Sequence, residues 1–435
     1  MKSFKMGVRN TLNNWRHSLG SMLSVAIGFA ALTLFNGYIS VVQDMYEDNY
    51  RQRSMFGDVM IEKSRNGKAI DFEDSRINEK EQQFIENFIT ENRSLVDQHA
   101  RFLIVSGFAN NGKSSAIYWG FGYDLEKGRQ LRDPTWPWNS KAGKPLDLQS
   151  EDAVMLGEDI GDTFGCVPER NERLLTKVGG YTAVERPFRC ERPNLQLTVT
   201  TDSGQVNAMA VTIGALGGVG LRGIDSWYLM MSLPKAQALH DTRDISHIRL
   251  RLKDKKMFGT FVERFNSAAS SAQLELRAFD WREHILARVY KRTMSLFLIF
   301  RDLVSAVILT ISGMSVLNAM VKSVNERQRE IGTLRSLGFR GSRIISIFTT
   351  EGVVIGLFGS AVGGALSVVA SLFLNRVEFI YYAGFLSDPV PFVIGLVPRL
   401  YLYSLFILCS IAAIASFFAA RRAVKISIPA LLSST

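Results

Sequence analysis

The first long apolar run of the chain is LGSMLSVAIGFAALTLFNGYISVV, residues 19–42. It contains no charged side chain and is longer than the roughly 20 apolar residues that cross a bilayer as a helix. A secretory signal peptide has a shorter apolar region, of about 7–15 residues, followed by a small-residue cleavage site. We therefore expect a retained transmembrane helix rather than a cleaved leader.

Three further apolar runs follow the first. They cover residues 303–321, 352–374 and 400–420, and the sequence LFLIF lies just before the first of them. Arg301 and Asp302 are adjacent in that region. Because charges are costly at the bilayer centre, we expect these two near the interface or facing other helices. The chain is thus predicted to cross a membrane four times.

Basic residues concentrate beside these runs and predict their orientation. Lys and Arg precede the first run, fill the connection between the second and third, and follow the fourth. Since cytoplasmic loops carry the excess of Lys and Arg, both termini are expected in the cytoplasm and a large domain outside. The expected parts are 1–18 (cytoplasmic amphipathic segment), 19–43 (first span), 44–290 (outer domain), 294–322 (second span), 323–348 (cytoplasmic connection), 351–375 (third span), 376–397 (short outer loop), 398–420 (fourth span) and 421–435 (cytoplasmic tail).

The net charge of +10 does not indicate nucleic-acid binding. No basic stretch is interleaved with aromatic residues, and the charges lie beside apolar runs, so membrane lipid is the expected partner. The five His and three Cys have no metal-ligand spacing, and no metal site is expected. Cys166 and Cys190 both lie in the outer domain; they could form a disulfide in an oxidising compartment or be two unrelated thiols.

Residues 44–290 read as a soluble domain of mixed α/β type, which makes the whole chain an α+β membrane protein. Apolar periodicity predicts helices over part of this range, and β-branched and aromatic runs predict strands. The Pro-flanked Trp residues predict a loop over 134–145. Helices are expected at 78–96 and 255–268, and strands at 101–107, 114–120, 195–200, 227–232 and 248–252.

The string GFANNGKS, residues 107–114, satisfies the nucleotide-binding pattern G-x-x-x-x-G-K-[ST]. That loop binds phosphate at the start of a helix, but the residues that follow here are rich in β-formers and Gly. We expect a hairpin tip at Asn-Asn-Gly instead. No G-x-S-x-G or H-E-x-x-H motif occurs, so no catalytic residue is expected.

The connection NERQREIGTLRSLGFRGSRIISIF, residues 325–348, is the most informative part of the chain. Ile331, Leu334 and Leu337 form an apolar stripe at helical spacing, and Gly338 is a plausible helix stop. A short amphipathic helix of this kind can dock into a groove on a partner or lie on lipid. The pattern alone leaves both interpretations open.

The connection resembles the cytoplasmic coupling segment of the FtsX-like (MacB/LolC/LolE) ABC permease family, roughly E-R-x-x-E-I-G-x-L-R-x-x-G. Glu351, at the start of the third span, is similarly typical of the family. Residues 155–165 resemble a family stretch I-L-G-x-x-L-A-x-x-L-G with four departures, and 223–239 resemble the segment after the central subdomain. The coupling pattern is matched at Glu326, Arg327, Glu330, Ile331, Gly332, Leu334, Arg335 and Gly338.

This resemblance implies a division of labour between subunits. ATP and Mg²⁺ would be bound by a separate ATPase, present in two copies, and this chain would hold no cofactor. A second permease chain, identical or paralogous, would complete the assembly in a bacterial inner membrane. The outer domain would be periplasmic, with Porter-like and Sabre-like subdomains, and a periplasmic carrier or adaptor is a further possible partner.

Small residues in the spans indicate close helix packing. Gly356, Gly359 and Gly363 lie in the third span, and Ser24 and Gly28 have matching spacing in the first. The glycines could pack against the first span of another permease chain or within one chain, and the sequence favours neither.

The resemblance implies a type VII, or mechanotransmission, ABC transporter. Lipoprotein release in the manner of LolC and LolE is the first hypothesis. Export of a peptide or small molecule through an adaptor, in the manner of MacB, is the second. The third is regulation of a cell-wall hydrolase by an FtsX-like protein.

Overall fold

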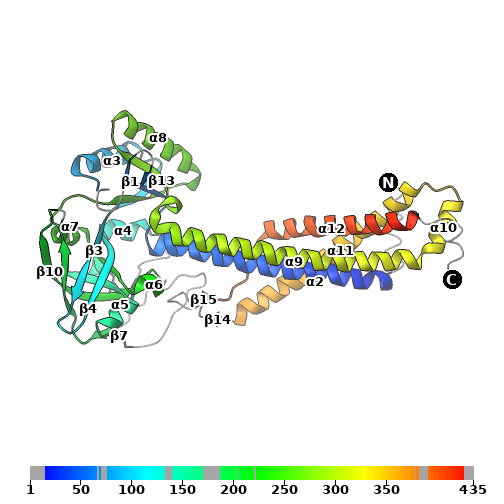
Figure 1. Cartoon of the computed structure of the whole chain (residues 1–435), viewed down its shortest axis with the longest axis horizontal. Coiled ribbons are helices and arrows are strands. Elements are labelled where there is room, and N and C mark those ends of the chain that lie inside the picture. The colour runs from blue at the N-terminus through cyan, green and yellow to red at the C-terminus, as the bar shows by residue number, and fades with distance from the viewer. Residues whose placement is uncertain are drawn as a thin grey trace. The chain divides into compact units, whose positions relative to one another are not determined.

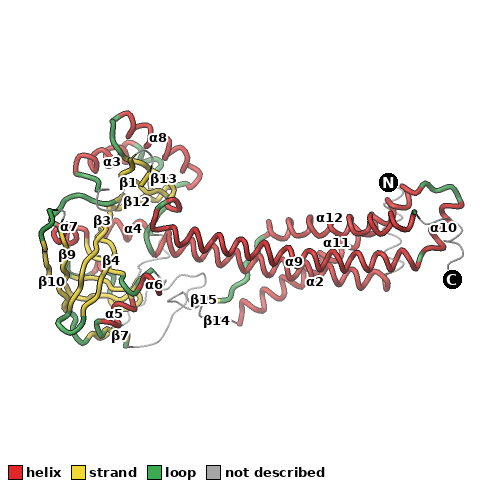
Figure 2. Tube along the Cα trace, viewed as in Figure 1, coloured by secondary structure: helices red, strands yellow, loops and turns green. Residues whose placement is uncertain are grey.

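The computed structural model describes residues 15–65, 68–69, 76–132, 140–169, 187–201, 203–219, 222–377, 379–381 and 390–425 (Figures 1 and 2). The N-terminal segment expected at 1–18 lies mostly outside these residues, as does most of the tail. The chain divides into two compact units. The helical unit comprises Met1–Gln43, Thr293–Phe379 and Phe392–Thr435, and the α/β unit comprises Asp44–Arg292 and Ile380–Pro391. The divisions fall next to the limits of 44 and 290 expected from sequence.

The described residues contain four helices that are long and apolar enough to cross a membrane. The mixed α/β region lies between the first two of them in the chain, so the predicted fold class is confirmed. Both α9 and α11 extend beyond the apolar runs, because polar residues at their ends continue the helical hydrogen bonding. The long helices are α2 (Trp15–Asp48), α9 (Arg288–Glu326), α11 (Gly341–Val377) and α12 (Pro398–Val424), with the short α10 (Gln328–Ser336) between α9 and α11.

Apolar side chains from all four long helices form the core of the helical unit. Phe29 of α2, Val316 of α9, Ile355 of α11 and Leu408 of α12 belong to one buried cluster. Many other large apolar side chains of these helices are exposed, for example Leu303 of α9 at 61%. In a bilayer, lipid covers such side chains, so their exposure agrees with membrane-spanning helices.

The α/β unit is built on one large sheet, which has eleven strands among the described residues, in the order β13-β1-β12-β3-β4-β11-β6-β10-β5 with β2 and β9 off this path. β9 pairs with both β10 and β3, so β3, β4, β11, β6, β10 and β9 close into a ring (Figure 2). The strands are β1 (Val59–Arg65), β2 (Lys68–Ala69), β3 (Val96–Asn110), β4 (Ser115–Tyr123), β5 (Ser140–Gly143), β6 (Ala153–Gly157), β7 (Cys166–Pro168), β8 (Phe188–Cys190), β9 (Asn194–Thr200), β10 (Val206–Gly217), β11 (Tyr228–Ser232), β12 (His247–Leu252), β13 (Leu276–Asp280), β14 (Ile380–Tyr381) and β15 (Val390–Pro391).

Helices pack on this sheet. α3 begins with a capping box, in which the Asn78 side chain accepts from the Glu81 backbone and the Glu81 carboxylate accepts from the Asn78 backbone. Its buried face carries Ile85 and Phe88, which agrees with the periodicity seen in sequence. The helices are α3 (Glu79–Glu91), α4 (Leu125–Leu131), α5 (Glu158–Thr163), α6 (Arg222–Asp225), α7 (Leu233–His240) and α8 (Phe258–Ser271), with single turns η1 (Asn49–Arg53), η2 (Leu146–Leu148), η3 (Lys255–Met257), η4 (Trp281–Glu283) and η5 (Ile285–Ala287).

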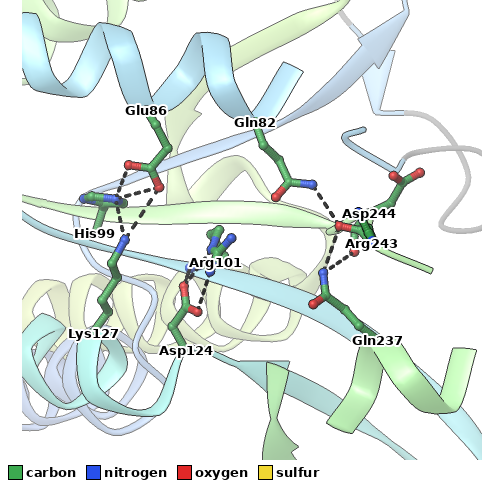
Figure 3. A network of polar contacts seen from close by, with 9 residues as sticks. All are labelled: Gln82, Glu86, His99, Arg101, Asp124, Lys127, Gln237, Arg243 and Asp244. Carbon is green, nitrogen blue, oxygen red and sulfur yellow. Dashed lines mark hydrogen bonds and ion pairs between the residues drawn. The ribbon is translucent and has the colours of Figure 1, made fainter. Parts of the chain in front are cut away.

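Polar contacts fasten α3 to β3 and α4 (Figure 3). His99 Nε2 of β3 lies 2.9 Å from Glu86 Oε2 of α3, and Lys127 Nζ of α4 lies 3.6 Å from the other oxygen. Beside them, Arg101 donates to Asp124 with 2.9 Å between Nε and Oδ2. The His99 hydrogen bond is the main reason why the pKa of Glu86 lies below its usual range.

Two local predictions for the α/β unit are corrected by the structure. The helix expected at 78–96 ends at Glu91, because Asn92 caps it and β3 starts at Val96. Within the loop expected at 134–145, Ser140–Gly143 form β5, whose pairing with the end of β10 defines it. An edge strand this short follows its neighbour and leaves no alternating pattern in sequence.

The string GFANNGKS forms the predicted hairpin between β3 and β4. Gly112 has φ +79, and the Asn111 side chain accepts from the backbone of Lys113 and Ser114 at 3.0 and 2.8 Å. No helix follows, and Lys113 forms an exposed ion pair with Glu191. The loop therefore lacks the strand-to-helix geometry that cradles phosphate.

Candidate functional site

The connection between α9 and α11 is the candidate site, and it is not a single loop. α9 continues to Glu326, a single residue, Arg327, separates it from α10, and α11 already begins at Gly341. At Arg327 the backbone angles are φ −107 and ψ 19, outside helical values, so the chain turns there. The segment expected at 323–348 therefore spans the end of one helix, all of α10 and the start of another.

Gly338 ends α10 as the sequence predicted. Its φ is +87, a left-handed conformation that residues with a side chain rarely adopt. Its backbone N–H donates to Arg335 O at 3.1 Å, and the next N–H, of Phe339, donates to Leu334 O at 3.0 Å. These two bonds are those of a Schellman motif, which ends α10 at this glycine.

The residues of the coupling pattern separate onto two faces of α10. Ile331 is 1% exposed and packs in the core of the helical unit, and Leu334 packs against the same core. Leu337 is 72% exposed, and Glu330 is exposed as well. The apolar stripe is therefore divided: Ile331 and Leu334 pack on the chain's own helices, while Leu337 faces outward, as does the charged Glu330.

Arg327 also turns inward. Its Nη1 lies 3.1 Å from Glu351 Oε2 and 3.3 Å from Oε1. The side chains of Arg327 and Glu351 are 10% and 1% exposed. The ion pair joins the turn before α10 to the third turn of α11, and sequence spacing alone does not reveal it.

The glycines of α11 pack within one chain. A Cβ on Gly359 would lie 2.7 Å from Val25 Cβ of α2, and Gly363 faces Ala26 one turn further along. Gly356 instead faces Cys409 of α12. The interpretation in which Gly359 and Gly363 pack against another chain's first span is therefore replaced by packing on α2 of the same chain.

Ser24 and Gly28 lie on a different side of α2. Ser315 Oγ of α9 donates to Ser24 Oγ at 2.7 Å, and Gly28 faces Ser312 of the same helix. The matching spacing in the first and third spans thus does not reflect contact between them. It reflects two separate seams, one between α2 and α11 and one between α2 and α9.

Polar links that the sequence did not suggest cross the helical unit. Thr33 Oγ1 of α2 donates to Ser367 Oγ of α11 at 2.8 Å, and that hydroxyl is 2.9 Å from Tyr401 OH of α12. Some hydroxyls buried among apolar helices form such links, and a sequence pattern does not name their partners. Arg301 and Asp302, by contrast, pair with each other at 2.7 Å on α9, and the Asp302 side chain is 68% exposed.

The α/β unit contains a disulfide and a cavity. Cys166 and Cys190 are bonded and join β7 to β8.

The cavity, of about 1050 Å³, is lined by β3, β4, β9, β10 and α7, with hydroxyls such as Thr198 inside and exposed Phe108 and Ile117 beside them. The lining also includes Arg76, His240 and Asp244, so it combines apolar, hydroxyl and charged groups. Within the described residues, no cluster of three or more His, Cys, Asp or Glu could hold a metal ion.

One family model matches the part of the chain that contains this site. Residues 303–428 match the family described as FtsX-like permease C-terminal. Over these residues the chain is similar to FtsX-like permeases. The match includes all of α10 and α11, so the resemblance inferred from the coupling pattern is confirmed.

MacB proteins are among the relatives of this chain. It is 33% identical over 122 residues to the macrolide export ATP-binding/permease protein MacB of Escherichia coli O157:H7, and equally to that of strain K12. The match covers 26% of this chain and 19% of those proteins. The chain thus spans about a fifth of the length of the curated relatives it matches.

Two solved structures resemble this chain more distantly. The extracellular domain of the transporter YknZ from Gram-positive bacteria has a TM-score of 0.32 and 9% identity, covering 51% of this chain and 99% of that one. The periplasmic region of MacB from Actinobacillus actinomycetemcomitans has a TM-score of 0.31 and 11% identity, covering 55% and 92%.

Proposed function

We propose that this chain is the permease of a type VII, or mechanotransmission, ABC transporter. A separate ATPase subunit would bind ATP and Mg²⁺ and dock on the outward face of α10. Two permease chains and two ATPases would form the working unit. The motion would pass through the long helices to the α/β unit, which would act on cargo or on a partner outside the membrane.

The outward face of α10 is the observation that carries this proposal. Leu337 is a large apolar side chain left 72% exposed at the end of a short helix, next to charged residues such as Glu330. An apolar anchor surrounded by charges is the usual composition of the centre and rim of a protein interface. Lipid contact explains it less well, because the Schellman turn at Gly338 places polar backbone and Arg340 beside it.

The distribution of charge supports a cytoplasmic location for α10 and for both termini. Arg329, Arg335, Arg340 and Arg343 are all within this connection, and Arg421 and Arg422 end α12. A basic excess of this kind marks the cytoplasmic side of a membrane. The disulfide in the α/β unit supports the opposite, oxidising side for that unit, which in a bacterial inner membrane is the periplasm.

Two finer assignments remain as proposals. Export of a peptide or small molecule through an adaptor has support from the relatives, which are named as macrolide exporters. Release of lipoproteins, in the manner of LolC and LolE, rests on the sequence resemblance. Purification of the assembled complex would distinguish them, since the first requires an adaptor protein and the second a paralogous permease.

Photo-cross-linking tests the docking proposal directly. A photoreactive amino acid at Leu337, in membranes of cells that make the complete complex, is expected to capture a protein other than a second copy of this chain, whose sequence contains a phosphate-binding G-x-x-x-x-G-K-[ST] loop. The same amino acid at Leu303, an exposed apolar residue within α9, is the matched control and should capture none. Equal capture from both positions, or none from Leu337, would refute the proposed docking face.

Labelling tests the proposed topology. With Cys409 replaced by Ser, a Gly112→Cys change places a single reactive thiol at the hairpin tip, because the other two cysteines are bonded. A maleimide that does not cross the inner membrane should label it from outside. Protection from the reagent until the membrane is broken would place the α/β unit in the cytoplasm and overturn the layout.

A further inference from the structure

The ion pair between Arg327 and Glu351 is buried within the helical unit, where charged side chains are uncommon. Nη1 of Arg327 contacts both carboxylate oxygens of Glu351, at 3.1 and 3.3 Å, and both residues are buried. Ile331 and Phe348, also buried, belong to the apolar cluster of the helical unit. A charge in such surroundings is costly unless a partner compensates it, so the two side chains depend on each other.

Neither member of this pair can dock a partner, since both are buried. Their position gives them another role. Arg327 is the only residue between α9 and α10, and Glu351 lies on α11, so one contact links three helices at the base of α10. Apolar contacts of Ile331 also hold α10, but they tolerate sliding, whereas an Arg–carboxylate pair has a fixed geometry.

Replacing a buried ion pair by apolar residues of similar volume is often neutral or stabilising. Stability alone therefore does not require charges at these two positions. The role that apolar residues cannot supply is orientation, because hydrogen bonds have direction and apolar contacts do not.

We propose that the Arg327–Glu351 pair positions α10, fixing its angle so that a force on its outward face moves α9 and α11 together. This role deepens the proposed function and rests on it, since the force comes from the ATPase. Arg327 and Glu351 are positioning residues and touch neither ATP nor cargo. Without the pair, α10 swings on its turn at Arg327 and the force is dissipated there.

Spin labels test the positioning in the chain alone. One label at Ser336 on α10 and one at Arg422 on α12, both exposed positions, report the distance between α10 and the helical unit in lipid nanodiscs with Cys409 replaced by Ser. With Arg327 and Glu351 both present, the distribution of distances between the two labels should have one narrow maximum. Glu351→Gln, Arg327→Met, and the apolar double change Arg327→Met with Glu351→Leu should each lose it and give a broad distribution. The exchanged pair, Arg327→Glu with Glu351→Arg, should restore the maximum.

If the single variants fold poorly, the apolar double variant still shows whether the ion pair positions α10. It is expected to keep the thermal midpoint of the original chain while the distance distribution broadens. The matched control is Asp302→Asn, which breaks an exposed Arg–Asp pair on α9 and should leave the distribution narrow. A narrow distribution in the apolar double variant would overturn the inference, because packing alone would then position α10.

A second measurement separates this inference from the proposed function. In the complex with its ATPase, the apolar double variant should bind the ATPase as the original chain does but lose stimulation of ATP hydrolysis. Full stimulation in that variant would overturn the inference. If the original chain binds no ATPase, the proposed function fails, while the spin-label result still decides whether the pair orients α10.

Discussion

Replacement of Gly359 by Ala tests how closely α11 packs on α2. The new Cβ would lie 2.7 Å from Val25 Cβ and 2.9 Å from Met22 O, whereas ordinary contact begins at 3.4 Å. The two helices must separate by about 0.7 Å, the difference between the first and last of these distances. Overpacking of this kind costs about 1–3 kcal/mol of unfolding free energy.

Gly364→Ala is the matched control for Gly359→Ala. It lies in the same helix, and its new Cβ would lie 3.4 Å from Phe29, at ordinary contact distance. Ala also favours a helix over Gly by about 1 kcal/mol, but this gain is common to both variants and cancels in their comparison. We therefore expect Gly359→Ala to unfold more easily than Gly364→Ala by about 1–3 kcal/mol.

A natural cysteine of the chain can report unfolding in this comparison. Cys409 of α12 is the one cysteine that is not in a disulfide, so a dye that fluoresces on reaction with thiols reports unfolding of the helical unit. At about 2–4 °C per kcal/mol for a unit of this size, Gly359→Ala should unfold at least about 2 °C below Gly364→Ala. Equal midpoints would refute the close packing of α11 on α2.

Two further predictions concern the α/β unit. Changing both Cys166 and Cys190 to Ser opens a disulfide with a sequence separation of 24, so the unfolding free energy of the α/β unit, measured by tryptophan fluorescence, should fall by about 3 kcal/mol. The unfolding midpoint of the helical unit, measured with the Cys409 dye, should not change. An unchanged midpoint by tryptophan fluorescence would show that the disulfide does not stabilise the α/β unit. Because His99 lowers the pKa of Glu86 below 4.5, the stability from this pair is complete above that pH and is lost as the pH falls through the lowered pKa. His99→Gln should flatten this acid limb of the stability profile, and an identical limb in both proteins would show that the pair does not contribute.

The spans and the domain order follow from sequence because they depend on composition. A bilayer requires about 20 apolar residues for each helix, and the first run at 19–42 exceeds that length. The β3–β4 hairpin was also predictable, since Asn-Asn-Gly between two β-forming runs has few other solutions. The stop of α10 at Gly338 followed from the same kind of local rule.

Contacts between distant residues could not be predicted. Periodicity placed Ile331 and Leu337 on one stripe of α10, but the turn at Arg327 decides which of them faces inward. Glycine spacing indicated close packing without naming the partner, which differs between Gly356 and Gly359. Such facts depend on how helices meet in space, and a single sequence records only the positions along each of them.

Arg249 is the clearest case in the α/β unit. In the sequence HIRLRL, alternation makes it look like a surface residue of a half-buried strand, yet it is 0% exposed. Its guanidinium lies 4.1–4.5 Å from the rings of Phe56, Phe102 and Phe121 and donates to Ser54 O at 2.7 Å. Both faces of β12 are buried at this point, and the sequence pattern of one strand does not show that.

ATP hydrolysis by the reconstituted complex shows most directly whether α10 couples this chain to its ATPase. The permease and its ATPase, in lipid nanodiscs, are compared with the same complex carrying Glu330→Lys, a charge reversal on the outward face of α10, and with Glu263→Lys, the same reversal at an exposed position of α8. We predict that the original chain and Glu263→Lys stimulate the ATPase equally and that Glu330→Lys does not, with all three proteins equally folded by the Cys409 dye and by tryptophan fluorescence. Equal stimulation by all three would contradict the assignment of α10 as the coupling element.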